Sequence, residues 1–332
     1  MNPVEWNNKR VLVTGAGGFI GSHLVETLVK QGAQVRAFVR YNSRGDPGHL
    51  AMLPAGTLDQ VELLTGDLRD LPTITAAAKG VDIILHLGAL IAIPYSYRHP
   101  VDVVETNVIG TLNVLLAARE NGVGRVVHTS TSEVYGTARR VPISEDHPLQ
   151  GQSPYSASKI GADKLAESFY DSYELPVVTL RPFNTYGPRQ SARAVIPTII
   201  TQALTQPVIH LGNLDARRDF TYVSDTVEGF LCAATTPGVE GKTFNLGTGS
   251  EIRIGDLVDE VVSIVGRPVS VEVETDRLRP VKSEVQRLIS DNRLAREQLG
   301  WAPQVDLHEG LFRTIHWIEE NLSLYRPNQY TV

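Results

Sequence analysis

Short apolar runs alternate with amphipathic segments along the first half of the chain. Residues 10–14 and 34–39 have the continuous apolar character of buried strands, and residues 20–31 carry apolar side chains at helical spacing. The alternation continues with strand-like runs at 61–65, 83–87, 126–130 and 177–181 and helical patterns at 74–79, 103–121 and 155–174. Buried strands that alternate with helices indicate a parallel sheet covered on both faces, so we predict a doubly wound α/β fold of the Rossmann type.

The pattern changes after residue 181. Several prolines between residues 182 and 207 interrupt the chain, and the strand and helix signals that follow are shorter. Proline cannot donate a ladder hydrogen bond, so this region is poorly suited to extend a regular sheet. We predict a first domain over residues 1–181, to which some later segments return, and a smaller mixed lobe over residues 182–332.

Composition narrows the class of protein. The chain has 332 residues, of which 42% are hydrophobic, and is long enough for one large domain or two. Its net charge of −6 lacks the basic surplus that nucleic-acid binding requires. No apolar run approaches the ~18 residues of a membrane-spanning helix, and residues 1–10 lack the apolar core of a signal peptide. Cys232, the single cysteine, excludes an internal disulfide. We expect a cytoplasmic protein without nucleic-acid or membrane partners.

A glycine-rich turn follows the first predicted strand. Gly15 permits a tight turn, Gly18 lets the backbone approach a pyrophosphate, and Gly21 allows the next helix to pack closely on the strand. Phe19 and Ile20 open that helix, whose N-terminus then faces the phosphates. Because the turn lies between a strand and an amphipathic helix, it predicts that the first domain binds a dinucleotide.

The residues at the adenosine end leave the choice of dinucleotide open. An acidic residue normally ends the second strand and holds the ribose, but Val39 and Arg40 stand there. Arg40, with a serine and a second arginine close behind it, is suited to a 2′-phosphate, which would indicate NADP. The alternative is a solvated basic loop beside a cofactor held by other contacts. Asp67 and Leu68, after the third strand, are placed to meet the adenine, or Asp67 caps its loop.

A tyrosine and a lysine four residues apart lie in a later helical segment. Tyr155 and Lys159 share one helix face, so both side chains reach the same site. A nearby ammonium stabilises a phenolate, which then accepts a hydroxyl proton while hydride leaves the substrate carbon. The pair follows a predicted strand that ends at Ser130 and Thr131. This arrangement predicts a nicotinamide-linked redox step. A catalytically silent protein that only senses a dinucleotide would need the glycine turn but not the tyrosine and lysine.

Glu133 adds a carboxylate to this pair. It ends the run Thr131, Ser132, Glu133 directly after the predicted strand. A glutamate within reach of an oxidised substrate can remove a carbon-bound proton, so elimination could follow oxidation. The alternative is a surface or capping carboxylate.

Several segments together resemble one enzyme family, the extended short-chain dehydrogenase/reductases that act on nucleotide sugars. The matching segments are the glycine turn, Asn107, residues 130–136, the Tyr155 and Lys159 pair and residues 181–188. The resemblance covers essentially the whole chain. Residues 91–97 and 277–280 make it most similar to the nucleotide-linked N-acetylhexosamine 4,6-dehydratases of legionaminic-type sugar pathways.

The resemblance implies a redox-neutral dehydration. Tyr155 would remove the proton of the sugar 4-hydroxyl, Lys159 would stabilise Tyr155 and bind the ribose, and Thr131 would hydrogen-bond the same hydroxyl. Glu133 would take the proton at carbon 5, water would leave, and hydride would return to carbon 6. Some dehydratases have an aspartate acid where this chain has Ser132. The leaving group would then draw its proton from Glu133 or from an ordered water.

The same resemblance leaves other reactions open. Nucleotide-sugar decarboxylases, which release carbon dioxide from a glucuronate, also carry the Thr-Ser-Glu run. Nucleotide-sugar 4/5-epimerases share the scaffold, and simple 4-epimerases usually lack the glutamate. The sequence therefore predicts a nucleotide-sugar 4,6-dehydratase that uses NAD or NADP, with a decarboxylase or an epimerase as the alternative.

The family also implies further contacts and an assembly. Its remaining cofactor contacts correspond to Leu87, Ala89, Ser130 and Phe183. Its substrate contacts correspond to Pro94, Asn184, Val195, Leu211, Arg218 and Arg279. The long helical segments at 103–121 and 155–174 pair across a two-fold axis in relatives, so a homodimer is expected. His86 and His128 have no carboxylate cluster at ligand spacing, so no metal is predicted.

Overall fold

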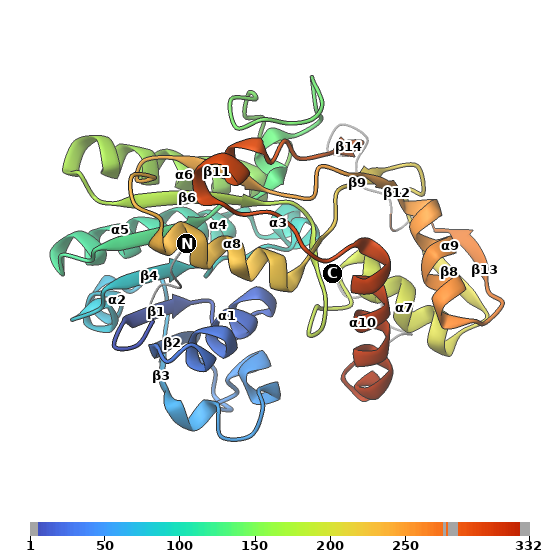
Figure 1. The fold of residues 1–332 in the computed structure, drawn as a ribbon, viewed down its shortest axis with the longest axis horizontal. Helices are drawn as coiled ribbons and strands as arrows, with labels where there is room; N and C mark the ends of the chain where they lie inside the picture. Colours follow the sequence, from blue (N-terminus) through green and yellow to red (C-terminus); the bar gives the residue numbers. More distant parts are fainter. Residues whose placement is uncertain (1–5, 275–276, 278–284, 326–332) are drawn as a thin grey trace.

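The computed structural model describes residues 6–274, 277 and 285–325, and its centre is a seven-stranded sheet (Figure 1). The strands are β1 (Arg10–Thr14), β2 (Gln34–Arg40), β3 (Val61–Gly66), β4 (Ile83–His86), β5 (Arg125–Thr129), β6 (Val177–Pro182) and β11 (Thr243–Leu246). Their order is β3-β2-β1-β4-β5-β6-β11, and every pairing is parallel. The strand order reverses its direction between β1 and β4. The predicted doubly wound α/β fold is confirmed.

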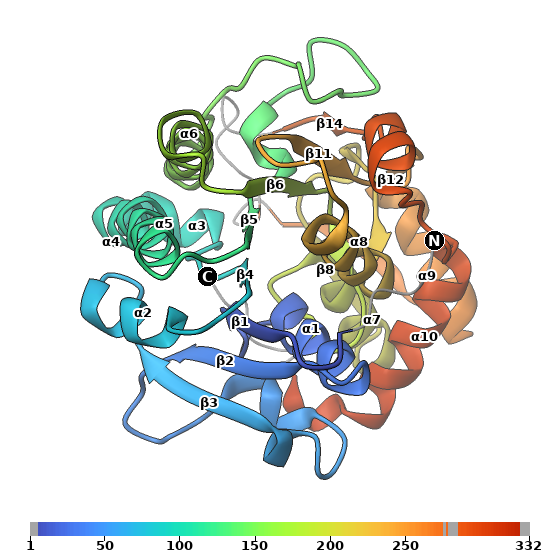
Figure 2. The ribbon, with the colours of Figure 1, turned by 60° about the vertical axis from the view of Figure 1, so that its left-hand side comes forward.

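Helices cover both faces of the sheet, as Figure 2 shows. One face carries α2 (Leu71–Ala78), α5 (Gly110–Glu120) and α6 (Pro154–Tyr173), and the other carries α1 (Phe19–Lys30) and α8 (Val223–Thr235). Successive strand residues point to opposite faces, so Leu12 packs in the first layer and Val13 in the second. A strand between two helical layers has no solvent face, which explains the continuous apolar runs in the sequence.

The first layer contains a longer helix than the apolar pattern indicated. α4 (Pro100–Val104), a π-helical turn (Glu105–Ile109) and α5 join into one helical run over residues 100–120. By length and composition this run alone, among the described residues, could cross a membrane; half of it is buried inside the protein, where it packs against α2 and α6. The sequence has no uninterrupted apolar run of this length, because Asp102 and Glu105 interrupt it, but the mean hydropathy of the helix is high.

The chain after β6 builds a second lobe and also returns to the sheet. β11 adds the seventh strand beside β6, and α8 packs on β4, β5 and β6. The second lobe, at the right of Figure 1, contains α7 (Val195–Thr205), β8 (Val208–Leu211), α9 (Ile254–Val265), β13 (Ser270–Val273) and α10 (Leu307–Glu320). Short strand pairings join β7 (Thr185–Tyr186) to β10 (Thr221–Tyr222), and β9 (Arg217–Arg218) to β12 (Ile252–Arg253) and β14 (Arg287–Leu288).

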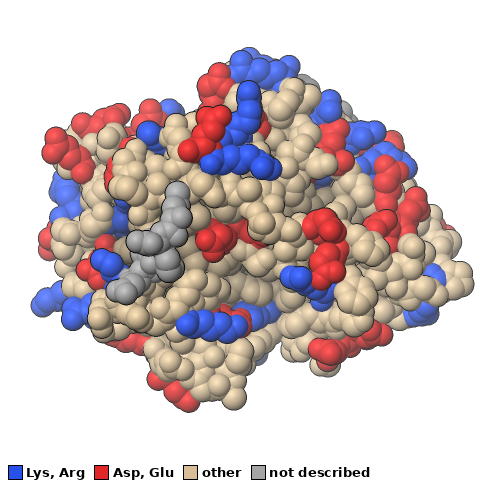
Figure 3. Space-filling model, viewed as in Figure 1, with Lys and Arg blue, Asp and Glu red and all other residues tan. Residues whose placement is uncertain are grey.

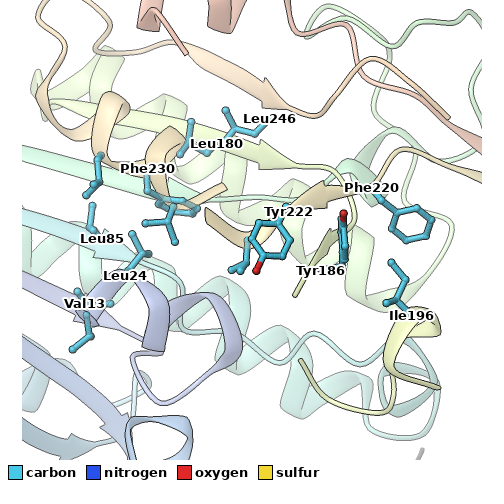
Figure 4. Packing of buried hydrophobic residues seen from close by; sticks show 14 of the residues in the cluster. Val13, Leu24, Leu85, Leu180, Tyr186, Ile196, Phe220, Tyr222, Phe230 and Leu246 are labelled. Atoms are coloured by element: carbon cyan, nitrogen blue, oxygen red, sulfur yellow. The ribbon is translucent and has the colours of Figure 1, made fainter. Parts of the chain in front are cut away.

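One hydrophobic cluster runs from the sheet into the second lobe (Figure 4). It includes Leu85 and Leu180 from the sheet, Phe230 from α8, and Tyr186 and Phe220 from the segments that lead into the lobe. The rings of Tyr186 and Phe220 meet edge to face, with centroids 6.1 Å apart. Because the two regions share this core, the second lobe is fixed next to the sheet.

Charged residues of both signs are interspersed over the face shown in Figure 3. Among the described residues, charged side chains form ion pairs, such as Arg36 with Glu62 and Lys30 with Glu26, each at 2.6 Å. Exposed pairs of this kind contribute at most about 1 kcal/mol each. The buried apolar clusters therefore supply most of the stability of the fold.

Candidate active site

A cleft with a volume of about 650 Å³ opens at the carboxyl ends of the central strands. The glycine turn after β1, the ends of β4 and β5, the start of α6 and residues 182–190 form its walls. In open parallel α/β sheets, ligands bind in this position, beside the point where the strand order reverses. The predicted site residues that line the cleft are Gly15, Gly18, Phe19, Ile20, Gly21, Arg40, Leu87, Ala89, Ser130, Thr131, Ser132, Glu133, Tyr155, Lys159 and Asn184.

The glycine turn has the geometry that a pyrophosphate site requires. Gly15 has a φ of 67°, in the left-handed region that favours glycine, and a Cβ there would lie 2.8 Å from the backbone nitrogen of Gly88. A Cβ on Gly21 would overlap the carbonyl oxygen of Gly15. α1 begins directly after Gly18, and its unpaired N–H groups lie at the wall of the cleft. The turn therefore leaves space for an anionic group.

A smaller cavity of about 130 Å³ adjoins the glycine turn. Asp67 and Leu68 line it together with Phe38, in the place expected for an adenine. Asp67 also caps its loop by accepting a hydrogen bond from the Arg69 N–H, and its hydrogen bonds with the Arg69 side chain lower the pKa of Asp67. Arg40 lines both this cavity and the main cleft. Asp67 therefore fits both roles considered for it.

The loop after β2 brings a carboxylate to the cleft that the sequence pattern did not reveal. Asn42 organises this loop by accepting hydrogen bonds from the N–H groups of Arg44 (3.1 Å) and Asp46 (3.0 Å). Asp46 accepts a hydrogen bond from the Gly48 N–H and lines the cleft. An acidic residue therefore lies at the cleft on the loop after β2, although none ends the strand itself. The amino-acid composition of residues 42–48 could have indicated this loop. Asparagine and aspartate stabilise such turns through hydrogen bonds of their own side chains.

α6 carries Tyr155 and Lys159 toward the cleft. The helix begins at a capping box in which Ser153 Oγ accepts a hydrogen bond from the Ser156 N–H (3.1 Å), with Pro154 in the first turn. Tyr155 and Lys159 are 7% and 4% exposed. Burial raises the pKa of Tyr155 and lowers the pKa of Lys159 to about 8. Lys159 is therefore largely protonated at neutral pH.

The turn after β5 brings a second set of polar groups to Tyr155. Thr131 caps a 3₁₀ turn (Ser132–Tyr135) by accepting a hydrogen bond from the Glu133 N–H (3.2 Å). Burial has the largest effect on the pKa of Tyr155 and raises it, a hydrogen bond with Thr131 lowers it, and the charge of Glu133 raises it. Ser132 is buried, and Glu133 is half-buried at the wall of the cleft. A hydroxyl, a carboxylate, a phenol and an ammonium therefore converge on one place.

A π-helical turn places Asn107 behind these residues. Its side chain accepts a hydrogen bond from the Leu90 N–H (2.7 Å) and donates to the Leu90 carbonyl oxygen (2.9 Å) and to Ser158 Oγ (3.0 Å). π-helical turns often mark functional sites, where the extra residue redirects a side chain. Here Asn107 ties the segment after β4 to α6, next to Lys159.

One predicted cofactor contact points away from the cleft. Phe183 is completely buried in a separate cluster that includes Tyr135. Its two chain neighbours, Pro182 and Asn184, line the cleft instead. Extended backbone turns successive side chains to opposite sides, and the sequence alone did not indicate which side faces the ligand.

Most of the predicted substrate contacts also lie outside the walls of the cleft. Pro94 lies in the first turn of α3 (Ile93–Arg98) and does not line the cleft, whereas its neighbour Ile93 does. Leu211 is buried in the main hydrophobic cluster, and Val195 packs against that cluster. Arg218 lines a separate cavity of about 370 Å³. Arg279 lies outside the described residues.

His86 and His128 are core residues of the buried strands. The Nδ1 and Nε2 atoms of His86 lie 2.7 and 3.0 Å from the hydroxyl oxygens of Thr14 and Thr111. His128 Nε2 lies 3.1 Å from a carboxylate oxygen of Asp163. Burial lowers the pKa of both histidines. Over the part of the chain that the structure describes, no group of three or more potential metal ligands occurs.

Comparison with known proteins identifies the family. Residues 12–314 match the sequence model of the GDP-mannose 4,6 dehydratase family. The chain belongs to this family. It is 36% identical over 316 residues to a UDP-glucose 4-epimerase of Mycolicibacterium smegmatis, covering 93% of this chain and 98% of that protein. It is also 36% identical over 323 residues to a dTDP-glucose 4,6-dehydratase of Streptomyces griseus, covering 96% of both chains.

A solved structure of the same family has the same fold. The dTDP-glucose 4,6-dehydratase of Streptomyces venezuelae, with NAD and TYD bound, superimposes with a TM-score of 0.86 at 32% identity, covering 96% of this chain and 100% of that one. These similarities confirm the nucleotide-sugar dehydratase and epimerase family predicted from the sequence. Members with both activities match equally well, so the residues of the cleft must distinguish the reaction.

Asn107→Ala tests how the cleft is supported. The change removes three hydrogen bonds and leaves both backbone groups of Leu90 unpaired. Because an unpaired buried polar group costs about 1–3 kcal/mol, we expect the free energy of unfolding to fall by about 2–4 kcal/mol. Urea unfolding measures this change. Asn113→Ala is the matched control, because Asn113 is also buried but makes a single hydrogen bond, to the Leu68 carbonyl oxygen. An equal loss in both variants would contradict the role of Asn107.

Proposed function

We propose that this protein is a nucleotide-sugar 4,6-dehydratase, which converts a nucleotide-linked hexose or N-acetylhexosamine into its 4-keto-6-deoxy form. The observation that carries the proposal is the half-buried carboxylate of Glu133 in the same cleft as Tyr155 and Lys159. Oxidation of a hydroxyl needs the tyrosine, the lysine and a nicotinamide. A carboxylate adds removal of a proton from carbon, and this makes elimination possible.

The residues present fit a nicotinamide dinucleotide. The turn at Gly15, Gly18 and Gly21 leaves space for the pyrophosphate, and the cavity at Asp67 and Leu68 leaves space for the adenine. When bound, the nicotinamide supplies the acceptance and return of a hydride. The proton transfers fall to side chains of this chain.

Tyr155 is the base of the first step. Its phenolate accepts the proton of the sugar 4-hydroxyl as carbon 4 becomes a ketone. Burial disfavours the phenolate, and the hydrogen bond with Thr131 opposes that effect. The Lys159 ammonium adds a positive charge on the same helix face, which stabilises the phenolate further.

Glu133 is the base of the second step. The new ketone makes the hydrogen at carbon 5 acidic, and the Glu133 carboxylate takes that proton. The 6-hydroxyl then leaves with this proton as water, and a double bond forms between carbons 5 and 6. Hydride returns to carbon 6 and a proton returns to carbon 5, which balances the proton that Tyr155 took. The net change is the loss of one water.

The charges in the cleft argue against the two alternatives. A 4-epimerase, supported by the identity to the Mycolicibacterium smegmatis protein, re-reduces the ketone and needs no base at Glu133. A decarboxylase binds a sugar carboxylate, which a cationic side chain close to Glu133 would favour. The cationic side chains among the described residues of the cleft are Lys159, buried below Tyr155, and Arg40, at the adenosine end.

Glu133→Gln separates oxidation from elimination. Glutamine keeps the size and hydrogen bonding of the side chain but cannot act as the base, so we expect dehydration to slow by about 10² to 10⁴. The sugar 4-ketone should still form and can be trapped as an oxime and weighed. A panel of UDP-, GDP- and dTDP-linked hexoses and N-acetylhexosamines supplies the substrate.

Tyr155→Phe is the matched control for this experiment. It removes the base of the first step, so neither the ketone nor the dehydrated product should form. If Glu133→Gln dehydrates the substrate at the wild-type rate, Glu133 has only a capping role. The dehydratase assignment would then lose its basis.

For the cofactor we propose NAD. Asp46 lines the cleft beside the glycine turn, where it is suited to accept hydrogen bonds from ribose hydroxyls and to repel a 2′-phosphate. The Streptomyces venezuelae dehydratase was solved with NAD. Arg40 lines the same cleft and favours a 2′-phosphate, so the two charges oppose each other.

Binding titrations on protein freed of dinucleotide distinguish these charges. Asp46→Asn should weaken NAD binding and strengthen NADP binding, because it removes the anion. Arg40→Ala should leave NAD binding nearly unchanged. Calorimetry measures both affinities, and a charged hydrogen bond contributes about 1.5–3 kcal/mol. A wild-type preference for NADP that Arg40→Ala abolishes would show that Arg40 holds a 2′-phosphate.

We also propose that the protein is a homodimer. Val101, Val104 and Ile109 on the helical run over residues 100–120 are 68%, 45% and 43% exposed. An exposed apolar stripe on a helix beside α6 is suited to the same stripe on a second copy, in a self-complementary four-helix arrangement.

Light scattering at micromolar concentration tests the dimer. Wild-type protein should have twice the mass of the chain. Ile109→Glu should give a monomer, because it buries a charge in the interface. Val273→Glu, at a 56% exposed position in the second lobe, is the control and should stay dimeric. A monomeric wild-type protein would rule out this assembly.

A further inference from the structure

A buried cluster of charges lies behind the candidate catalytic residues. Asp163 stands one helical turn after Lys159 on α6 and is 4% exposed. One of its carboxylate oxygens accepts hydrogen bonds from Ser130 Oγ (2.8 Å) and from the Nε and Nη2 atoms of Arg181 (3.2 and 3.0 Å). The other lies 3.1 Å from His128 Nε2. A buried carboxylate with this many partners is held in one place and remains ionised.

These contacts join three elements at the floor of the cleft. His128 lies in β5 and Ser130 directly follows it, Asp163 lies in α6, and Arg181 lies in β6. Ser130 immediately precedes Thr131, which hydrogen-bonds Tyr155. Asp163 therefore holds the start of the turn that carries the candidate catalytic side chains.

Arg181 holds the other end of the same turn. Its Nη1 donates a hydrogen bond to the Tyr135 hydroxyl (2.9 Å), and Tyr135 donates in turn to Asn245 Oδ1 (2.7 Å). Tyr135 ends the 3₁₀ turn that contains Glu133. The buried ion pair of Asp163 and Arg181 thus holds both ends of the segment 130–135.

The charges around Lys159 come from several elements. The titratable and charged groups that face Lys159 or the buried ion pair are His86 of β4, His128 of β5, Glu133 and Tyr135 of the 3₁₀ turn, Glu145 of the loop before α6, Tyr155 and Asp163 of α6 and Arg181 of β6. Burial lowers the pKa of His86 and His128, so both are neutral at neutral pH. Burial also lowers the pKa of Lys159, and the opposing effect on Lys159 comes from Asp163.

We propose that Asp163 is a positioning residue that holds the catalytic turn at Ser130 and places a fixed negative charge one helical turn from Lys159. Asp163 does not line the cleft, so it acts through Lys159 and Ser130. Arg181 and His128 support it by keeping its carboxylate fixed. The proposal rests on the role proposed above for the Tyr155 and Lys159 pair, which is shared by dehydratases, decarboxylases and epimerases.

Asp163→Asn tests the proposal through the pH profile of kcat. The activity of the wild-type protein should fall on the basic side as Lys159 loses its proton, near its pKa of about 8. Removal of the nearby carboxylate disfavours the ammonium, so Lys159 loses its proton at lower pH. We expect the basic limb to move down by about 1–2 pH units. KM should stay within about twofold of wild type, because Asp163 does not line the cleft.

Two further variants keep the result decisive. Glu240→Gln breaks the partly buried ion pair with Arg125 at the opposite ends of the strands, so the basic limb should not move. If Asp163→Asn does not fold, Asp163→Asn combined with Arg181→Met removes the uncompensated guanidinium and should show the same downward shift. Circular dichroism establishes folding in each case.

The outcome is independent of which sugar reaction the enzyme performs. The profile is measured on whichever nucleotide sugar is turned over, because the Tyr155 and Lys159 step precedes dehydration, decarboxylation and epimerisation alike. An epimerised product with a shifted limb would overturn the proposed dehydratase function and leave the role of Asp163 intact. A dehydrated product with an unmoved limb in a folded Asp163 variant would overturn the role of Asp163 alone.

Discussion

The ammonium of Lys159, buried beneath the cleft, is the group on which the arrangement of the site depends. Moving such a charge from water into the protein interior is costly unless partners compensate for the lost hydration. Lys159 is 4% exposed, and burial lowers its pKa to about 8. α6 supplies Asp163 one turn away, and β5 and β6 hold Asp163 through His128 and Arg181. The carboxylate of Asp163, near Lys159, thus joins a helix and two neighbouring strands of the sheet.

The proposed mechanism uses two bases on different elements of this site. Tyr155 lies on the same helix face as Lys159, whose ammonium would stabilise the phenolate that we propose as the first base. Glu133 lies on the turn after β5, which Thr131 caps, and it reaches the cleft from another side. A substrate between them can lose a hydroxyl proton to one group and a carbon-bound proton to the other. The parallel sheet makes this possible because the ends of neighbouring strands meet at one edge.

Local patterns predicted most of the scaffold. The strands and helices of the first 181 residues follow from the periodicity of apolar positions, and the glycine turn follows from its place between a strand and a helix. Tyr155 and Lys159 follow from helical spacing. What the sequence did not reveal depends on distant contacts or on side-chain direction. Ser130 and Asp163 meet although they are 33 residues apart in the chain. Asp46 reaches the cleft only through the folding of its loop, and Phe183 turns inward while its neighbours face the cleft.

The most direct measurement follows one hydrogen through the reaction. Wild-type enzyme is given its nucleotide sugar with deuterium at carbon 4, and the product is examined by mass spectrometry and NMR. A redox-neutral dehydratase should release one water and deliver the deuterium to carbon 6, because the hydride taken from carbon 4 is returned there. A product of unchanged mass with the deuterium still at carbon 4, or a product that has lost carbon dioxide, would contradict the dehydratase function.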